Sequence, residues 1–187
     1  MFNGGASQNS NLNAGTDLIF DQLTPGKMTV VAKLYVTDPS PAGGIAEKND
    51  GDNWGWYSGF SFGWNSSGAL NAIVERRAGD MSVSTGNGTI PYAKWVQVAF
   101  TWDGTVGNAS AAHLFLNGVE QSKASSTDGS GTIGYAGATN QPLLIGNANL
   151  GAIWASLSGK MAYFAIYKGR ILTTTEMNQL DAQLPIH

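Results

Sequence analysis

Short segments in which apolar and polar side chains alternate recur along the chain, and this alternation limits the possible folds more than any other feature. In the segment 28–36 every second residue is apolar, namely Met28, Val30, Ala32, Leu34 and Val36. Because successive side chains of a strand point to opposite faces, a period of two predicts a strand with one buried face. The segments 57–64, 95–102 and 161–167 have the same pattern and are separated by turn residues. Together they predict an all-β protein.

The composition agrees with an all-β fold and excludes several other classes. The 187 residues include 25 glycines, only 12% are charged, and 42% are hydrophobic. A disordered chain, a coiled coil or a helical bundle would need more charge or less glycine. The chain contains no cysteine, which excludes a disulfide scaffold, a thiolate metal site and a cysteine nucleophile. The length is that of one ordinary domain, so we treat residues 1–187 as a single domain.

The tryptophans of two predicted strands are expected in the core. Trp64 alternates with Phe60 and Phe62. The segment 95–102 carries bulk on both faces: one presents Val96, Val98, Phe100 and Trp102, the other Trp95, Gln97, Ala99 and Thr101. Such a strand is expected inside a sheet that is covered on each side. We therefore predict that both Trp95 and Trp102 are core residues.

Local signals in the second half of the chain predict a hairpin, a further strand and a helix. Asn117–Gly118 between two strand patterns is typical of a tight hairpin turn, since both turn positions need positive φ. The alternation in 161–167 predicts one strand face with Met161, Tyr163, Ala165 and Tyr167. Thr173 and Glu176 have capping-box spacing, and they predict a helix whose buried face carries Met177, Leu180 and Leu184. The segment 122–137, rich in Ser, Thr and Gly, is expected to be an exposed loop.

A set of short motifs follows one another in a characteristic order. The central ones are Trp95-Val96-Gln97-Val98-Ala99, Thr101-Trp102-Asp103-Gly104 and Leu114-Phe115-Leu116-Asn117-Gly118. Those nearer the ends are Phe2-Asn3-Gly4, Leu144-Ile145-Gly146, Leu157-Ser158-Gly159-Lys160-Met161 and Ala165-Ile166-Tyr167. The ordered set resembles laminin-G-like domains of the concanavalin A-like lectin/glucanase superfamily and spans almost the whole chain. The resemblance implies a two-sheet jelly-roll sandwich in which the concave face and the rim loops bind ligands. With the strands and the helix predicted above, the expected fold is a two-sheet antiparallel jelly-roll β-sandwich with one short C-terminal helix.

The same fold includes glycoside hydrolases and polysaccharide lyases, so we looked for catalytic residues. A glycosidase needs two carboxyl groups that flank the scissile bond. None of Glu47, Glu75, Glu120 and Glu176 has a carboxylate two or four residues away. His113 and His187 have no evident catalytic partner in the sequence. We therefore expect no enzyme activity and no catalytic residue.

One polar loop predicts either a metal site or a plain turn. Asn49, Asp50 and Asp52 lie close together and could offer oxygen ligands to Ca²⁺. The resemblance supports calcium at a rim loop. Asn, Asp and Gly are also the residues that any tight polar turn uses, and Asp103 before Gly104 is expected to be such a turn residue. Calcium is thus a possible cofactor, and no other is indicated.

Aromatic side chains beside this polar loop predict a ligand-binding patch. Asn53, Trp54, Trp56 and Tyr57 follow the acidic residues, and Trp154 lies in a later loop. Flat aromatic rings stack on the apolar faces of sugars while polar groups bind the hydroxyls. The alternative is that these rings pack over the edge of the sandwich. Separately, Arg76-Arg77 lies at a predicted hairpin tip and could hold the sulfate or carboxylate of an acidic glycan, although two solvated arginines are the more common interpretation.

We predict a non-catalytic lectin-like binding or adhesion module that recognises a glycan or another surface ligand through its rim loops. The first alternative is a structural decoration or tail-surface protein of a phage particle that docks onto capsid or other structural proteins. The second and least favoured is a glycoside hydrolase or lyase. No signal peptide is visible, and a virion protein needs none, so we expect an extracellular or virion-surface location. We expect no nucleic-acid partner and no membrane insertion, because basic residues do not cluster and no apolar stretch is long enough; an oligomer is possible.

Overall fold

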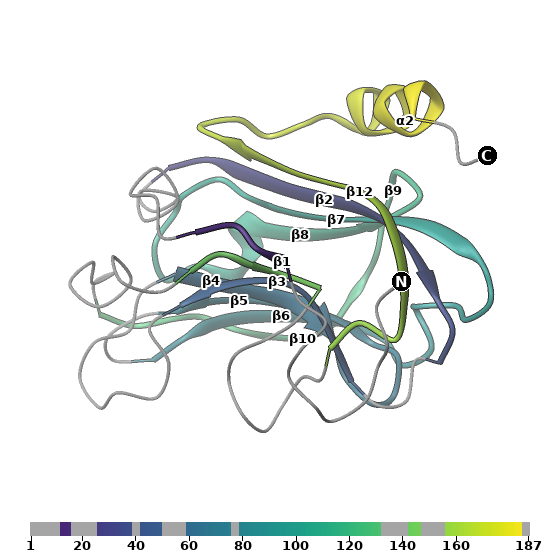
Figure 1. Cartoon of the computed structure of the whole chain (residues 1–187). Helices are drawn as coiled ribbons and strands as arrows, with labels where there is room; N and C mark the ends of the chain where they lie inside the picture. The colour runs from purple at the N-terminus through teal and green to yellow at the C-terminus, as the bar shows by residue number, and fades with distance from the viewer. Residues whose placement is uncertain are drawn as a thin grey trace.

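The structure is a computed structural model that describes residues 12–15, 26–38, 42–49, 59–75, 79–131, 142–146 and 156–184. Within these residues two antiparallel sheets pack face to face, and one helix lies on the outer side of one sheet (Figure 1). One sheet has the order β1 (Leu12–Asn13), β11 (Leu144–Ile145), β3 (Gly43–Asn49), β4 (Gly59–Trp64), β5 (Leu70–Glu75), β6 (Met81–Thr85) and β10 (Lys123–Thr127). The other has the order β12 (Gly159–Lys168), β2 (Met28–Val36), β7 (Trp95–Trp102), β8 (Ala112–Leu116) and β9 (Val119–Glu120). A short 3₁₀ turn, η1 (Ala109–Ala111), precedes β8, and the helix α2 (Thr174–Gln183) follows β12. The all-β sandwich with a late helix is confirmed.

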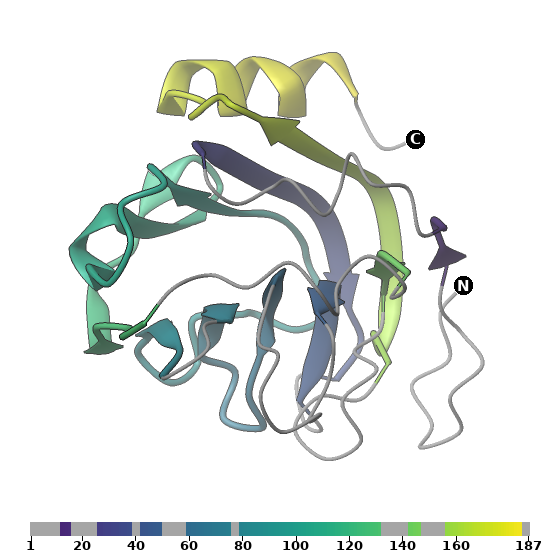
Figure 2. The ribbon, with the colours of Figure 1, turned by 90° about the vertical axis from the view of Figure 1, so that its left-hand side faces the viewer.

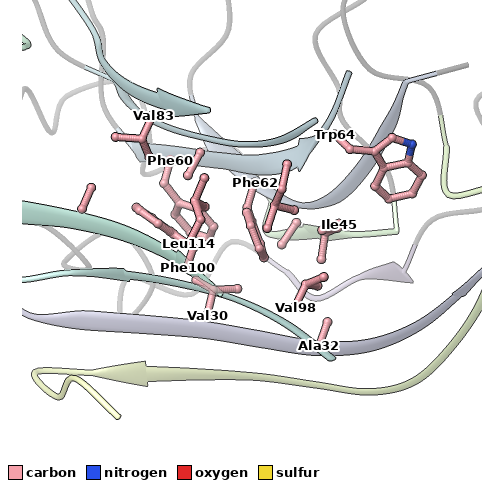
Figure 3. Close-up of a cluster of buried hydrophobic side chains, with 14 of the residues drawn as sticks. Val30, Ala32, Ile45, Phe60, Phe62, Trp64, Val83, Val98, Phe100 and Leu114 are labelled. Atoms are coloured by element: carbon pink, nitrogen blue, oxygen red, sulfur yellow. The ribbon is translucent and has the colours of Figure 1, made fainter. Parts of the chain in front are cut away.

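The core lies between the two sheets and is built from the side chains that alternation predicts to face inward. The five apolar residues of β2 that share a face are all fully buried. Figure 3 shows side chains from both sheets meeting in this layer. Phe62 of the seven-stranded sheet and Phe100 of the five-stranded sheet contact each other with ring centroids 5.9 Å apart. Trp64 and Trp102, at 0% and 1% exposure, are core residues as expected.

The helix α2 covers part of the outer face of the five-stranded sheet, on the side away from the seven-stranded sheet (Figure 2). Val31 of β2 and Ala99 of β7 form a second buried cluster there with Leu172 and Met177. This explains why β7 carries bulk on both faces. The capping box is present as predicted, because the Thr173 hydroxyl accepts from the Glu176 amide while the Glu176 carboxylate accepts from the Thr173 amide.

One side chain of the predicted helix face is placed differently. Met177 is fully buried and Leu180 packs against the second cluster. Leu184, in contrast, is 45% exposed. The helix ends at Gln183, so Leu184 is the C-cap residue with non-helical φ and ψ, and it leaves the face that Met177 and Leu180 share.

The predicted face of the last strand is corrected by a β-bulge. The pairing of β12 with β2 shifts between Met161 and Tyr163, which leaves Ala162 as the extra residue. Met161 therefore packs into the main core, whereas Tyr163, Ala165 and Tyr167 face α2. An unbroken period of two put all four on one face, and a bulge breaks that period by one residue.

The hairpin turn is confirmed and the long exposed loop is not. Asn117 and Gly118 have φ values of 49° and 71°, as the tight turn between β8 and β9 requires. Within the segment 122–137, however, β10 pairs with β6 as the edge strand of its sheet. Its residues are mostly exposed. Small polar side chains on an edge strand bury no face, so no alternation marks β10 in the sequence.

Candidate functional site

The residues predicted to bind a ligand lie almost entirely outside the described part of the chain. This holds for Asp50, Asp52, Asn53, Trp54, Trp56, Tyr57 and Trp154. Asn49 is the last residue of β3, and only its backbone is described. The aromatic patch and the calcium ligands therefore stay predictions. The described strands nevertheless fix where each of these loops begins and ends.

The polar and aromatic loop 50–58 is anchored at one end of the seven-stranded sheet. It connects β3 to β4, and Asn49 pairs with Gly59 across that hairpin. Gly59 in turn pairs with Glu75, the last residue of β5. The next residues along the chain are Arg76 and Arg77. The segment 50–58 and the arginine pair therefore both begin at the same end of the sheet, which we call the β3–β4 end.

The loop that carries Trp154 is anchored elsewhere. It begins after Gly146, whose amide donates to the Ile45 carbonyl at 2.8 Å, and it returns at Leu157, whose amide donates to the Gly146 carbonyl at 2.8 Å. Ile45 lies four residues before Asn49, which is about 13 Å along an extended strand. The strands therefore do not bring the anchors of Trp154 and Trp54 to the same place.

Trp95 is not a core residue, and this prediction was wrong. Trp95 pairs with Tyr35 of β2, and both side chains are only partly buried. They lie on the outer face of the five-stranded sheet, where α2 covers Gln97 and Ala99 but leaves Trp95 partly exposed. Sequence reasoning correctly placed bulk on both faces of β7, but it contained no signal for how far the helix would extend.

Three residues from neighbouring strands form an aromatic and cationic group on this outer face. Lys160 of β12 pairs with Tyr35, which pairs with Trp95. The Tyr35 and Trp95 rings meet edge to face with centroids 5.5 Å apart, and the Lys160 ammonium lies 5.9 Å from the centroid of the Tyr35 ring. We call Tyr35, Trp95 and Lys160 the Tyr35 cluster. The bulge at Ala162 is what places Lys160 on the same face as Tyr163.

A polar network separates the Tyr35 cluster from the buried contacts of α2. The Lys33 ammonium donates to Asp181 at 2.7 Å, and the Gln97 amide donates to the Tyr163 hydroxyl and to the Met177 carbonyl, each at 2.7 Å. Burial raises the pKa of the Tyr163 phenol to about 12, despite the bond from Gln97 that acts in the other direction. The network keeps these polar groups paired beneath the helix.

Three other ionisable side chains, those of Asp103, Glu176 and His113, have structural partners. The Asp103 carboxylate accepts from the Thr105 amide at 2.7 Å, which confirms the predicted turn. Hydrogen bonds from the Thr105 side chain and then from its amide hold the pKa of Asp103 below its ordinary value. Hydrogen bonds from Thr173, and more weakly the charge of Arg170, lower the pKa of Glu176. His113 Nδ1 lies 2.6 Å from the Glu120 carboxylate on the surface. Among the described residues no three His, Cys, Asp or Glu side chains form a group that could hold a metal ion.

The family of the chain follows from its sequence. Residues 4–178 match the Laminin_G_3 model of the concanavalin A-like lectin/glucanases superfamily. The chain belongs to this superfamily. Membership confirms the resemblance that the ordered motifs carried. The search of curated protein sequences found no match to this chain.

Solved structures with the same fold include binding modules and parts of larger enzymes. The CBM40 of the Ruminococcus gnavus IT-sialidase is 14% identical with a TM-score of 0.63, and the match covers 94% of this chain and 98% of that chain. The NanB sialidase from Streptococcus pneumoniae is also 14% identical, with a TM-score of 0.66 over 95% of this chain, which spans only 27% of that enzyme. Mouse laminin alpha1 domains LG4-5 are 16% identical with a TM-score of 0.57, covering 89% of this chain and 41% of that chain. At these identities the likeness establishes a shared sandwich fold and no shared ligand.

None of the helices in the described parts of the chain is long and apolar enough to cross a membrane.

Proposed function

We propose that this chain is a non-catalytic, lectin-like module that binds a glycan at the β3–β4 end. The observation that carries the proposal is the register in which Asn49 pairs with Gly59 and Gly59 with Glu75. In that register, the segment with Trp54 and Trp56 and the segment with Arg76 and Arg77 both begin at one end of a rigid sheet. Binding residues are commonly carried on loops that a rigid scaffold positions.

The chemistry of these two segments suits a sugar. Aromatic rings offer flat apolar surfaces to the C–H faces of a pyranose, and amide or carboxylate groups bind its hydroxyls. Arginine is well suited to a sugar that carries a carboxylate, because its fork of donors matches the two oxygens. The proposed ligand is therefore a glycan, and an acidic terminal sugar is the form that would use Arg76 and Arg77.

The structural likenesses support a binding module in particular. One solved structure of the Ruminococcus gnavus CBM40 is described as bound to alpha2,3 sialyllactose, and it covers 85% of this chain with a TM-score of 0.61. The whole of that module has about the extent of this chain, whereas the NanB enzyme is several times longer. The sandwich alone is thus a sufficient frame for glycan binding in that protein.

The carboxyl groups of Asp103 and Glu176 are unsuited to general acid catalysis. A glycosidase general acid needs a raised pKa so that it stays protonated at neutral pH. The pKa values of Asp103 and Glu176 are instead both lowered by hydrogen bonds. Each is held by a turn or a helix cap and belongs to the framework of the fold.

The test is a glycan-array screen of the purified chain, followed by titration of each bound glycan with and without EDTA. We expect binding that Trp54→Ala abolishes and that the double change Arg76→Ala with Arg77→Ala weakens for acidic glycans. Val119→Ala is the matched control, since Val119 is a 63% exposed side chain on the opposite sheet. Loss of binding in EDTA would support the calcium ligands Asn49, Asp50 and Asp52. Binding to no glycan would overturn the proposal, and release of a shortened sugar would overturn its non-catalytic part.

A further inference from the structure

The Tyr35 cluster combines two partly buried aromatic rings with one exposed lysine on the outer face of the five-stranded sheet. Its three residues sit side by side on β12, β2 and β7, where Lys160 pairs with Tyr35 and Tyr35 with Trp95. Tyr35 and Trp95 are partly buried, and Lys160 is exposed. The cluster lies on the other sheet from the β3–β4 end. It is also at the opposite end of the sandwich. Tyr35 lies near the end of β2, and β3 begins at Gly43, only a few residues later in the chain. The β3–β4 end lies at the other end of β3, after Asn49.

The strands beneath the cluster hold it in a fixed arrangement. β2 pairs with β7 along eight successive positions and with β12 on its other side. Just beyond the cluster the Thr37 hydroxyl donates to the Ser158 carbonyl at 2.9 Å and lies 3.0 Å from the Ser158 hydroxyl. Rings held on central strands lose little freedom when a ligand binds, which favours affinity.

The cluster lies outside the contacts that dock α2. The helix reaches as far as Lys33, which lies two residues before Tyr35 on the same face and forms an ion pair with Asp181. Gln97, two residues after Trp95, is fully covered and bonds to the helix, whereas Trp95 is not. Docking of α2 therefore explains the buried part of this face and leaves the aromatic pair unexplained.

The charge of the cluster indicates which partner would fit. The Lys160 ammonium lies over the Tyr35 ring, and among the described residues no carboxylate forms an ion pair with it. An apolar protein surface placed here would strip water from this ammonium without compensating it. A sugar with an anionic group would stack its C–H face on the aromatic rings and place its charge against the ammonium.

We infer that the Tyr35 cluster is a second carbohydrate site, specific for a saccharide that carries a carboxylate or a sulfate. Trp95 supplies the stacking surface, with Tyr35 set edge to face against its ring. Lys160 supplies the positive charge. The hydroxyls of the exposed Thr37 and the partly buried Ser158 border the cluster and can bond to sugar hydroxyls. The inference does not depend on the loop at the β3–β4 end.

The experiment measures binding of three defined tetrasaccharides by isothermal titration: a sulfated heparin fragment, a carboxylated hyaluronan fragment and neutral cellotetraose. We expect binding of at least one anionic fragment and weaker binding of the neutral one. Lys160→Gln should lower the affinity for the anionic fragment about threefold at low salt. Trp95→Ala should lower the affinity for the same fragment at least about tenfold. Lys94→Gln is the matched control, because Lys94 is an exposed lysine beside Trp95 in the sequence and should leave the affinity unchanged.

A second readout keeps the test independent of folding. The indole N–H signal of Trp95, assigned with Trp95→Phe, should shift when the anionic fragment is added to the unmodified chain. Lys160 is exposed, so Lys160→Gln is expected to fold normally. The sulfated and carboxylated fragments tell which anionic group is preferred.

The outcomes separate this inference from the proposed function. Binding that Trp54→Ala abolishes and Trp95→Ala leaves intact overturns the second site while supporting the β3–β4 end. Binding that Trp95→Ala abolishes and Trp54→Ala leaves intact supports the second site and counts against the first. Binding of neither anionic fragment, or equal binding of the neutral one with no effect of Lys160→Gln, overturns the inference.

Discussion

At the scale of single residues, close approach and special backbone geometry explain several positions that composition alone does not. Gly43 pairs directly with Trp64, and a Cβ atom at position 43 would overlap the buried indole ring. Glycine is required there for space and not for its φ angle. Asn117 and Gly118 have the positive φ that the turn between β8 and β9 requires, and a Cβ atom at position 118 would also meet the Asn178 side chain.

The close contact at Gly43 yields the first stability prediction. Gly43→Ala should lower the free energy of unfolding by roughly 1–3 kcal/mol, because overpacking against a rigid, fully buried ring forces the strand or the indole to move. Gly86→Ala is the control, since a Cβ atom there meets nothing within 4 Å, and it should stay within about 0.5 kcal/mol. Urea denaturation measures both. Trp64→Phe should lower the free energy of unfolding less in the Gly43→Ala background than in the unmodified chain. An equal decrease in both backgrounds would contradict the explanation.

At the scale of elements, α2 is held on the sheet by one apolar cluster and one polar network. Met177 and Leu172 supply the apolar contact with Val31 and Ala99. The polar network joins Lys33 to Asp181 and Gln97 to Tyr163. At the start of the helix Arg170 also pairs with Glu176. Helix docking therefore depends on side chains from three neighbouring strands of the five-stranded sheet.

The Tyr163 phenol makes this docking sensitive to alkaline pH. Its pKa is raised to about 12 in the folded chain, against an ordinary value of 10.0 in the unfolded chain. The unfolded chain loses this proton first, so the stabilisation is complete below about pH 10 and declines as the pH rises toward 12. We expect the free energy of unfolding of Tyr163→Phe to fall less steeply over this range than that of the unmodified chain. Tyr92→Phe, at a 64% exposed tyrosine, should keep the original slope; identical slopes for all three proteins would refute the assignment.

At the scale of the whole molecule, the two sheets form one core and leave different surfaces for binding. Side chains from β2, β7 and β8 meet those from β3, β4, β5 and β6 in a single cluster. The loops at the β3–β4 end extend from the seven-stranded sheet, and the Tyr35 cluster lies on the outer face of the five-stranded sheet. A closed apolar core therefore allows both surfaces to vary without loss of the fold.

Contact between the sheets can be measured at Phe62 and Phe100. A double-mutant cycle with Phe62→Leu and Phe100→Leu should give a coupling energy of about 0.5–1.5 kcal/mol, as expected for two aromatic rings in contact. Leucine keeps each site apolar, so the single variants should remain folded. The control cycle pairs Phe62→Leu with Phe115→Leu, since Phe115 packs in the separate cluster under α2. Coupling in the control as large as in the test pair would show that the effect is not the ring contact.

The sequence by itself determined the features that depend on near neighbours. Alternation placed the β2 side chains correctly in the core, Asn117–Gly118 marked a hairpin, and Thr173 with Glu176 marked the start of the helix. Each of these signals acts within a few residues of the chain. The ordered motifs gave the superfamily, and with it the sandwich.

Only the tertiary structure decided the features that depend on which strands become neighbours. The bulge at Ala162 turns Met161 into the core and Lys160 toward Tyr35, and nothing in the local pattern marks it. The exposure of Trp95 depends on where α2 ends its contact with the sheet. The segment with Trp154 begins beside Ile45, because β11 pairs with β3 at Ala46 and Glu47. The segment with Trp54 begins at the end of β3, after Asn49. Such pairings join residues distant in sequence, so a reading of local periodicity cannot foresee them.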